Sequence, residues 1–267
     1  MKKIFLTGAS SGIGLATAKL LSANGHEIWG TSRDPSRIAS LPGLHPVRLN
    51  LSDPASVENG FNSALAEAGH FDVLINNAGS GHFGPAELLD DEILAGQFQV
   101  LVFSHVQLMR LTLQAMRRQN HGVIINVTSL ASRLPVPFMA AYNSAKAAMA
   151  AFTMSIQLEL GNSDTRIVDL QPADICTDFN RGVIKDQTND PSYASKLAKT
   201  WDATERNMSN APKPELVARH ILKLIGEANP PPRITVGDIF QTKIAPFIFR
   251  FLPQRVRVWG LKKYYGI

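Results

Sequence analysis

Short apolar runs alternate with amphipathic segments along most of the chain. The segments between them have helical spacing, and the longer ones follow Asp53-Pro54 or cover about 90–119, 140–160 and 214–228. The apolar runs are rich in Val, Ile and Leu, which predicts short buried strands at residues 4–6, 27–32, 46–51, 71–76, 122–128, 165–171 and 233–236. This alternation predicts an α/β fold: a single-domain, Rossmann-type, doubly wound parallel sheet with helices on both faces.

A glycine-rich turn, Thr7-Gly8-Ala9-Ser10-Ser11-Gly12-Ile13-Gly14, follows the first predicted strand and precedes a segment of good helix formers. Glycine permits a tight turn at the first position, approach of a pyrophosphate at the second and close helix packing at the third. The N-terminus of the following helix favours an anion. The stretch therefore predicts a dinucleotide site at Gly8, Ser10, Ser11, Gly12, Ile13 and Gly14. For this stretch alone, the alternative is a flexible turn without a ligand.

Polar residues also follow other predicted strands, at the edge where such sheets bind ligands. The second strand ends in Ser32-Arg33 without an acid, and because arginine can pair with a 2′-phosphate, this favours NADP over NAD. Alternatively, Arg33 is a solvated turn residue. Asn50, followed by Leu51, is placed to bond adenine, and Asn77-Ala78-Gly79 suits a strand end that a cofactor crosses. Asn76 either contacts the cofactor or ties neighbouring backbones together.

Three residues carry the predicted chemistry: Ser129, Tyr142 and Lys146. Ser129 closes an apolar run and so lies at the carboxyl end of a strand, whereas Tyr142 and Lys146 are four apart in a helical stretch and share one helix face. A free tyrosine titrates near pH ~10, and an adjacent ammonium group is expected to lower its pKa toward useful acid–base work. The serine hydroxyl is expected to hold a substrate carbonyl or hydroxyl in line.

Composition and charge narrow the function classes. The 267 residues include one cysteine, so an internal disulfide framework is excluded, and the histidines have no ligand partners at suitable spacing for a metal. The net charge of +5 is concentrated in residues 239–267, which argues against nucleic-acid binding by the whole domain. Since no signal peptide and no stretch of about 18 uncharged apolar residues is present, we expect a cytoplasmic protein.

Taken together, the motifs resemble those of the short-chain dehydrogenase/reductase family, most closely its branch acting on steroids, retinoids and related lipophilic alcohols. The resemblance spans about residues 2–237 and rests on the glycine turn, Asn76–Gly79, Ser129, Tyr142-Asn143-Ser144-Ala145-Lys146, and Pro172 with Thr177. It implies that Tyr142 is the acid/base, that Lys146 also bonds the nicotinamide ribose, and that Ser129 stabilises the reacting oxygen. It further implies that Pro172, Ile175 and Thr177 hold the carboxamide, and that the protein forms a homodimer or homotetramer.

The chain departs from the family pattern at the central helix. Leu101 stands where the family usually has an asparagine, which puts the water-linked proton relay from Lys146 in doubt; Gln97 or Gln99 could compensate or lie on the solvated face. Ala173 replaces the glycine after Pro172, a modest change where φ is not positive. The main hypothesis is an NADP-dependent oxidoreductase that interconverts a lipophilic alcohol and its ketone or aldehyde. The alternative is an NADP-binding sensor or scaffold with little catalysis.

The chain divides into a catalytic domain, residues 1–238, and a basic, aromatic C-terminal tail, residues 239–267. Within the domain, residues of about 178–211 are polar and are expected to form a lid over the substrate. The apolar residues 134–139, just before Tyr142, favour a lipophilic substrate over a sugar. The tail interleaves bulky apolar side chains with bases, which suits peripheral contact with an anionic membrane, a helix packed over the pocket, or a subunit interface.

Overall fold

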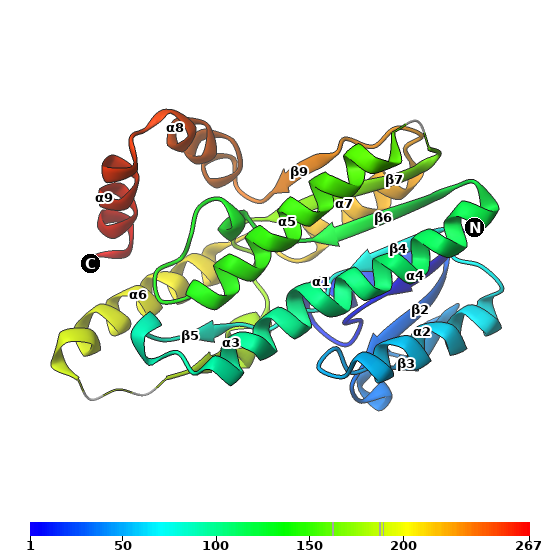
Figure 1. Ribbon diagram of the computed structural model, residues 1–267, viewed down its shortest axis with the longest axis horizontal. Coiled ribbons are helices and arrows are strands. Elements are labelled where there is room, and N and C mark those ends of the chain that lie inside the picture. Colours follow the sequence, from blue (N-terminus) through cyan, green and yellow to red (C-terminus); the bar gives the residue numbers. More distant parts are fainter. Residues whose placement is uncertain (162, 187, 189) are drawn as a thin grey trace.

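A computed structural model describes residues 1–161, 163–186, 188 and 190–267 (Figure 1). Within these residues, seven strands form a parallel sheet in the order β3-β2-β1-β4-β6-β7-β9. Their bounds are β1 Lys3–Leu6, β2 Glu27–Ser32, β3 Leu44–Arg48, β4 Val73–Asn76, β6 Gly122–Val127, β7 Thr165–Pro172 and β9 Arg233–Val236. The order reverses between β1 and β4, and such a switch point opens a ligand crevice beyond the carboxyl ends of the strands. The predicted doubly wound architecture is confirmed.

Alternation within the strands gives the sheet two apolar faces. In β1, Ile4 and Leu6 pack into one cluster with α1 and α7, whereas Phe5 points to the opposite face and packs with α2, α4 and α5. The helices that cover the sheet are α1 Gly12–Ala23, α2 Pro54–Ala68, α4 Ser104–Gln119, α5 Ala140–Leu160 and α7 Glu215–Gly226. Asp53 caps α2 by accepting from the Ala55 amide, and Pro54 occupies its first turn, as the Asp-Pro pair predicts.

Two elements differ from the sequence prediction. The single helix expected over residues 90–119 is divided into α3 Asp91–Phe98, a π-helical segment Gln99–Phe103, and α4. The edge strand β3 begins at Leu44 and ends at Arg48, so Asn50 and Leu51 lie in the loop that follows it rather than in the strand. Pro46 is tolerated because β3 is an edge strand and has a partner on one side only.

The expected lid contains regular structure. A 3₁₀ segment, Asp178–Gly182, leads to β8 Ile184–Lys185, which pairs with β5 His82–Phe83, and then to the 20-residue helix α6 Pro191–Asn210. Residues 187 and 189 of the expected lid lie outside the described residues.

The C-terminal tail folds into a π-helical segment Phe240–Ile244 and the helices α8 Ala245–Phe251 and α9 Gln254–Tyr265. These helices lie at the upper left in Figure 1, at the same end of the molecule as α6. Within the described residues, none of the helices combines the length and the apolar character that a bilayer crossing requires.

Candidate active site

One cavity of about 1480 Å³ lies beyond the carboxyl ends of β1, β2, β4, β6 and β7. It brings together residues that are far apart in the sequence and that come from nearly every element at this end of the sheet. Nearly all of the site residues predicted from the sequence line it: Gly8, Ser10, Ser11, Gly12, Ile13, Ser32, Arg33, Asn50, Leu51, Asn77, Ala78, Gly79, Ser129, Tyr142, Lys146, Pro172, Ile175 and Thr177.

Gly14 does not line the cavity. A Cβ at this position would lie 1.9 Å from the Gly8 carbonyl oxygen and 2.7 Å from Asn77 Nδ2. The residue therefore lets the first turn of α1 pack directly on the glycine turn, and its place in the dinucleotide site stays a prediction. Gly8 has φ +73°, and a Cβ there would lie 3.0 Å from Ala78, so the turn also requires glycine at its first position.

The N-terminus of α1 is free to bind an anion. Ser11 occupies the N-cap position but its side chain makes no capping hydrogen bond, and the first turn carries no acidic residue. The first amides of a helix lack intrahelical partners and carry a partial positive charge. Together with the narrow cradle at Gly8, this end of the cavity fits a dinucleotide phosphate.

Two arginines line the cavity beyond β2. Arg33 was predicted from the sequence, and Arg37, four residues later, was missed. Asp34 lies between them, but its carboxylate accepts the Ser36 amide and hydroxyl, and these hydrogen bonds lower the pKa of Asp34. The carboxylate is thus engaged locally in capping the 3₁₀ segment Pro35–Arg37, while both guanidinium groups are exposed.

The asparagines at the strand ends have different roles. Asn76 is buried, donates to Asn126 Oδ1 at 2.9 Å and to the His105 carbonyl, and so ties β4 to β6 and α4. Asn77 Nδ2 donates to the Thr7 carbonyl at 2.9 Å and joins β4 to the glycine turn while lining the cavity. Asn50 Oδ1 accepts the Ser52 amide, which fixes the loop after β3.

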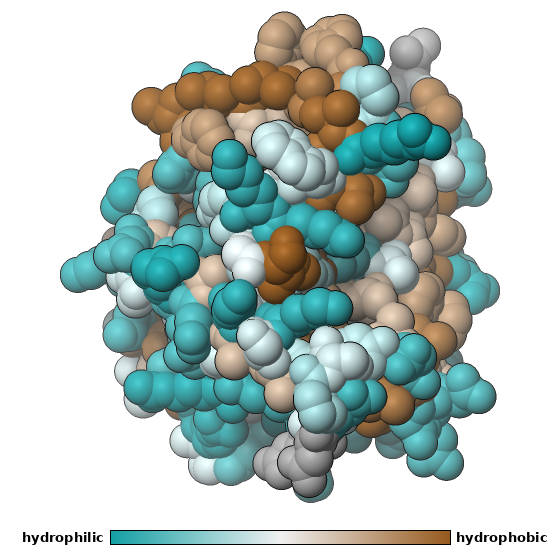
Figure 2. Space-filling model, turned by 90° about the vertical axis from the view of Figure 1, so that its left-hand side faces the viewer, coloured by the Kyte–Doolittle hydropathy of each residue, from teal (hydrophilic) through white to brown (hydrophobic). Residues whose placement is uncertain are grey.

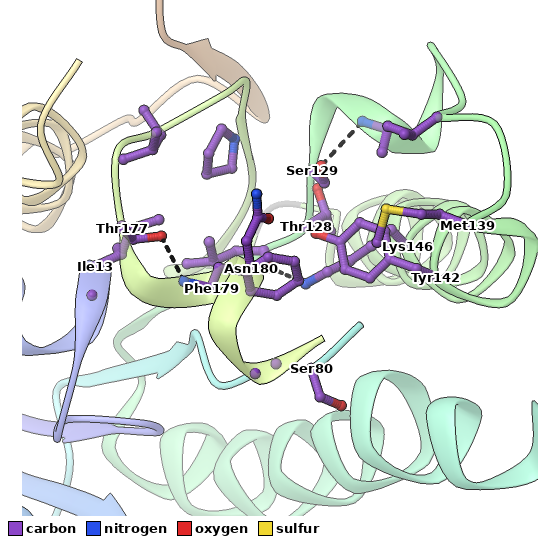
Figure 3. A pocket seen from close by; sticks show the side chains of 18 of the residues that line it. Ile13, Ser80, Thr128, Ser129, Met139, Tyr142, Lys146, Thr177, Phe179 and Asn180 are labelled. Atoms are coloured by element: carbon purple, nitrogen blue, oxygen red, sulfur yellow. Dashed lines mark hydrogen bonds between the residues drawn. The ribbon is translucent and has the colours of Figure 1, made fainter. Parts of the chain in front are cut away.

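Ser129, Tyr142 and Lys146 lie close together beside the cavity (Figure 3). Ser129 follows β6, and its Oγ accepts the Ala131 amide at 3.1 Å. Tyr142 and Lys146 lie one turn apart on α5, and Lys146 Nζ lies 5.8 Å from the centre of the Tyr142 ring. Lys146 is 4% exposed and donates to the Val127 carbonyl at 2.8 Å, which fixes its ammonium group below the tyrosine.

Burial sets the acid–base properties of this pair. Desolvation raises the pKa of Tyr142 to about 12, although hydrogen bonding with Ser129 acts to lower it. Desolvation also lowers the pKa of Lys146 to about 8, against the opposing field of Asp169. The expectation that Lys146 lowers the pKa of Tyr142 is therefore wrong for this structure, because the loss of hydration outweighs the other effects.

The segment after β7 closes the cavity opposite α5. Thr177 Oγ1 accepts the Phe179 amide at 3.3 Å (Figure 3), and Ile175 is buried. Ala173 is not among the residues with positive φ in the described chain, so it substitutes for glycine without backbone strain. Its amide donates to the Val236 carbonyl and anchors the segment to β9.

Leu101 lies in the π-helical segment and is fully buried. It packs with Val102 and Ala145, and a Cβ on Gly79 would lie 3.3 Å from it, so hydrocarbon occupies this position between α4 and α5. Neither glutamine considered as a substitute lies on the solvated face. Gln99 donates to Ser104 Oγ, whereas Gln97 is buried, lines the cavity, donates to Ser80 Oγ at 3.1 Å, and has an Oε1 without a hydrogen-bond partner among the described residues.

The rest of the cavity wall is largely apolar and extends to the C-terminal tail. Val136, Met139 and Phe179 form the wall near Tyr142, whose ring centre lies 5.6 Å from that of Phe179. Thr204 and Met208 of α6 add to it, and the tail contributes Phe240, Gln241, Ala245, Phe249, Leu252, Val256, Arg257, Gly260, Leu261, Tyr264 and Tyr265. The sequence left open whether the tail packs over the pocket, and the structure shows that these tail residues line the cavity.

A polar link fastens the tail to the segment after β7. The Asp174 amide donates to Gln241 Oε1, and Gln241 Nε2 donates to the Asp174 carboxylate. Burial raises the pKa of Asp174, although the bond from Gln241 opposes this. Tyr264 Oη of α9 accepts a hydrogen bond from Asn207 of α6, so this bond joins α9 to α6.

Histidines and acidic residues form no metal cluster in the described part of the chain. The buried His82 Nε2 lies 2.8 Å from Asp186 Oδ1 and joins the first residue of β5 to the residue after β8.

Comparison with known proteins identifies relatives over the whole chain. A family model described as short chain dehydrogenase matches residues 2–188. A 3-ketodihydrosphingosine reductase of Bacteroides thetaiotaomicron is 30% identical over 99% of this chain and 98% of its own length. Carbonyl reductase [NADPH] 2 of Sus scrofa is 33% identical over 73% of this chain and 79% of its own length.

Solved structures share the fold. A short-chain dehydrogenase from Streptomyces avermitilis superposes with a TM-score of 0.83 at 24% identity, covering 98% of this chain and 96% of that one. Other structures of this fold hold NAD or NADP⁺.

Proposed function

The chain belongs to the short-chain dehydrogenase family, and from this premise we propose that it is an NADPH-dependent reductase of a lipophilic ketone. Family membership makes it an oxidoreductase that acts on carbonyl or alcohol groups. The proposal adds the cofactor, the direction and the substrate class. The observation that carries it is the single cavity that joins the glycine turn, Tyr142 and an apolar wall.

The cofactor preference rests on the end of β2. NADP differs from NAD by a 2′-phosphate on the adenosine ribose, and two exposed guanidinium groups, Arg33 and Arg37, line the cavity there. The one acid between them, Asp34, is held by Ser36. The glycine turn and the N-terminus of α1 would hold the pyrophosphate, and Ile175 and Thr177 would hold the carboxamide.

The chemistry follows from the positions of three side chains. When bound, the reduced nicotinamide supplies a hydride to the carbonyl carbon of the substrate. Tyr142, whose pKa of about 12 keeps its proton on Oη at neutral pH, donates that proton to the carbonyl oxygen. The Ser129 hydroxyl orients the same oxygen. Lys146 then stabilises the phenolate through its buried positive charge, which the carbonyl of Val127 holds in place.

The substrate class is inferred from the wall of the cavity. Val136, Met139, Phe179 and the tail residues Phe249 and Leu252 offer an extended apolar surface, which favours a hydrocarbon chain over a sugar. The full-length relative from Bacteroides thetaiotaomicron is named for reduction of 3-ketodihydrosphingosine, which supports a long-chain ketone and the reductive direction. The homodimer or homotetramer implied by the resemblance stays a prediction.

Cofactor titration combined with turnover tests the proposal. NADPH and NADH are titrated into the purified protein, its Arg33→Asp variant and the matched control Arg118→Asp on the far end of α4. Because hydrogen bonds to charged groups contribute about 1.5–3 kcal/mol, Arg33→Asp is expected to weaken NADPH binding roughly 10- to 100-fold and NADH binding little. Turnover is then followed on medium- and long-chain ketones.

Two outcomes contradict the proposal in different ways. Equal weakening of both cofactors by Arg33→Asp would remove the basis for the NADPH preference. Tight NADPH binding without turnover on any ketone or aldehyde would instead favour the sensor or scaffold, in which Leu101 blocks the proton relay.

A further inference from the structure

Large hydrophobic side chains are exposed along the C-terminal tail, residues 239–267. Among the described residues, the side chains of this kind that are more than 60% exposed within the tail are Ile239, Phe247, Phe251 and Trp259. Others are exposed by 39–53%: Phe240, Ile244, Ile248, Val256, Val258 and Tyr264. Figure 2 shows hydrophobic side chains gathered along the upper edge of this end of the molecule, above a band of hydrophilic ones. Scattered single apolar residues need no explanation, but a contiguous group marks an interaction surface.

The helix α8 and the residues that flank it, Ile244 and Leu252, carry two apolar stripes. Ala245, Phe249 and Leu252 line the cavity, whereas Ile244, Phe247, Ile248 and Phe251 follow the i, i+3, i+4, i+7 spacing on the outward face. The rings of Phe247 and Phe251 lie 5.2 Å apart, and each is more than two-thirds exposed. A helix that is apolar on both sides is normally surrounded by apolar material, and here only the inner side is covered by the protein.

Positive charge accompanies this surface. The tail contains six of the 27 basic residues and none of the 22 acidic ones, so the rest of the chain has 21 bases against 22 acids. Lys243, Arg250, Arg255, Lys262 and Lys263 are exposed. Aromatic and aliphatic side chains interleaved with exposed bases are the composition of segments that lie in the interface of an anionic bilayer.

We propose that the C-terminal tail is a docking surface for an anionic lipid bilayer. The outward stripe of α8 and Trp259 of α9 would enter the boundary between headgroups and acyl chains, with the five exposed bases at the lipid phosphates. A second copy of this chain fits less well. In a two-fold interface the same patch faces itself, which would place these cations against one another with no acid in the tail to neutralise them.

Docking has a consequence for substrate access. Because α8 and α9 line the cavity with their inner faces, a docked tail places the cavity next to the bilayer, and a lipophilic substrate need not cross water. This consequence rests on the proposed function, but docking itself does not. Vesicle binding is measured without cofactor or substrate, so its failure and failure of the proposed reaction are separate results.

Flotation of the full-length protein with vesicles tests the proposal. We expect the protein to float with phosphatidylcholine vesicles that contain phosphatidylglycerol, to float poorly with phosphatidylcholine alone, and to be released as salt screens the charges. Phe247→Ser combined with Phe251→Ser is expected to abolish flotation. Arg250→Gln combined with Arg255→Gln is expected to weaken binding about 25-fold, since each base near an anionic surface contributes about fivefold.

Matched controls lie at the opposite end of the molecule. Arg117→Gln combined with Arg118→Gln removes two exposed bases from the last turn of α4, and Leu158→Ser removes a side chain of α5 that is 78% exposed. Both variants should float as the unmodified protein does, and all variants should keep the thermal unfolding midpoint of the unmodified protein, which shows that they are folded.

Three outcomes overturn the proposal. The first is absence of the full-length protein from the vesicle fraction. The second is flotation that neither tail variant changes. The third is a lipid-free molar mass that falls when Phe247 and Phe251 are replaced, because a second copy would then cover this surface.

Discussion

Tyr142 and Lys146 share one face of α5, and burial moves each of them toward its uncharged form. A tyrosine whose pKa is about 12 holds its proton throughout the neutral range, which suits donation to a carbonyl oxygen that becomes basic as hydride arrives. For Lys146 the uncharged form is unfavourable, because the side chain stabilises the phenolate only while it is charged. Its pKa of about 8 keeps most of the charge at pH 7.

Replacing Tyr142 by Phe removes the proton donor and little else. Because the ring remains, its packing against Phe179 is kept, and NADPH binding is expected to be unchanged. Loss of general acid catalysis is expected to lower kcat by about 10²–10⁴-fold. Steady-state turnover and cofactor titration measure the two quantities, with Tyr193→Phe as the matched control. Unchanged turnover in Tyr142→Phe would exclude the acid–base role.

Replacing Lys146 by Met is expected to stabilise the fold while it lowers activity. Burial lowers the pKa of Lys146 from 10.5 to about 8, which means that the charged lysine reduces the free energy of unfolding by roughly 3 kcal/mol at neutral pH. The bond to the Val127 carbonyl is lost and offsets part of this, so a gain of about 1–3 kcal/mol in the free energy of unfolding is expected at pH 7.

The stability gained by Lys146→Met is expected to decrease as the pH rises. Below pH 8 the lysine is charged in both states, and the full penalty of burial is present. Between pH 8 and 10.5 the folded protein loses the proton first while the unfolded chain keeps it, so the stability of the unmodified protein rises with pH. Denaturant unfolding at pH 7 and pH 9.5 should therefore show the advantage of Lys146→Met shrinking, while Lys19→Met, at an exposed position, shows no such change.

The sequence predicted which residues form the site better than it predicted the environment of each residue. Sequence spacing identified the glycine turn, Ser129, Tyr142 and Lys146. The pKa shift of Tyr142, however, depends on how much protein surrounds its hydroxyl, and spacing does not show this. Arg37 was missed because it reaches the cavity through the 3₁₀ turn that Asp34 caps. At Gly14 the motif predicted close helix packing, and the structure shows that the missing side chain makes room for the Gly8 carbonyl.

At the scale of elements, strong periodicity was a reliable guide, and local signals were more informative than composition. β2, β9 and α5 begin and end where the pattern predicts. The polarity of residues 178–211 predicted a lid without naming any element in it, and the region contains α6, in which Thr200 and Ala203 are the buried residues. Asp190 caps α6 and Pro191 opens it, the same signal that identified the start of α2 at Asp53-Pro54.

The interruption of the 90–119 helix has no comparable signal. A π-helical segment changes the hydrogen bonding by one residue, and the apolar spacing of Leu101, Val102 and Leu108 remains compatible with a continuous helix. The two-stranded pairing of β5 with β8 is equally hidden, since each strand has two residues and their partners lie about 100 positions apart. Such elements depend on tertiary contacts rather than on their own sequence.

At the scale of the whole molecule, the tail changes the shape of the cavity. The catalytic end of the sheet would leave an open crevice, but Phe249, Leu252, Val256 and Leu261 extend one apolar wall from Tyr142 outward. The bond pair between Asp174 and Gln241 fastens this wall to the segment that follows β7. The concentration of basic residues in the tail distinguished it from the catalytic domain, but it left open whether the tail covers the pocket. The structure shows that it borders the cavity.

A wall of this length predicts a dependence of activity on the substrate's chain. Each methylene buried against it contributes about 0.8 kcal/mol, so kcat/KM for a series of unbranched ketones is expected to rise about fourfold per added carbon until the wall is filled. Phe249→Ala combined with Leu252→Ala should flatten that rise for the longer ketones and leave the shorter ones and NADPH affinity unchanged. Ile248→Ala, on the outward face of the same helix, is the matched control, because it alters α8 without altering the cavity. A kcat/KM that does not depend on chain length, or that Ile248→Ala changes as much as the inward pair does, would mean that the tail does not contact the substrate.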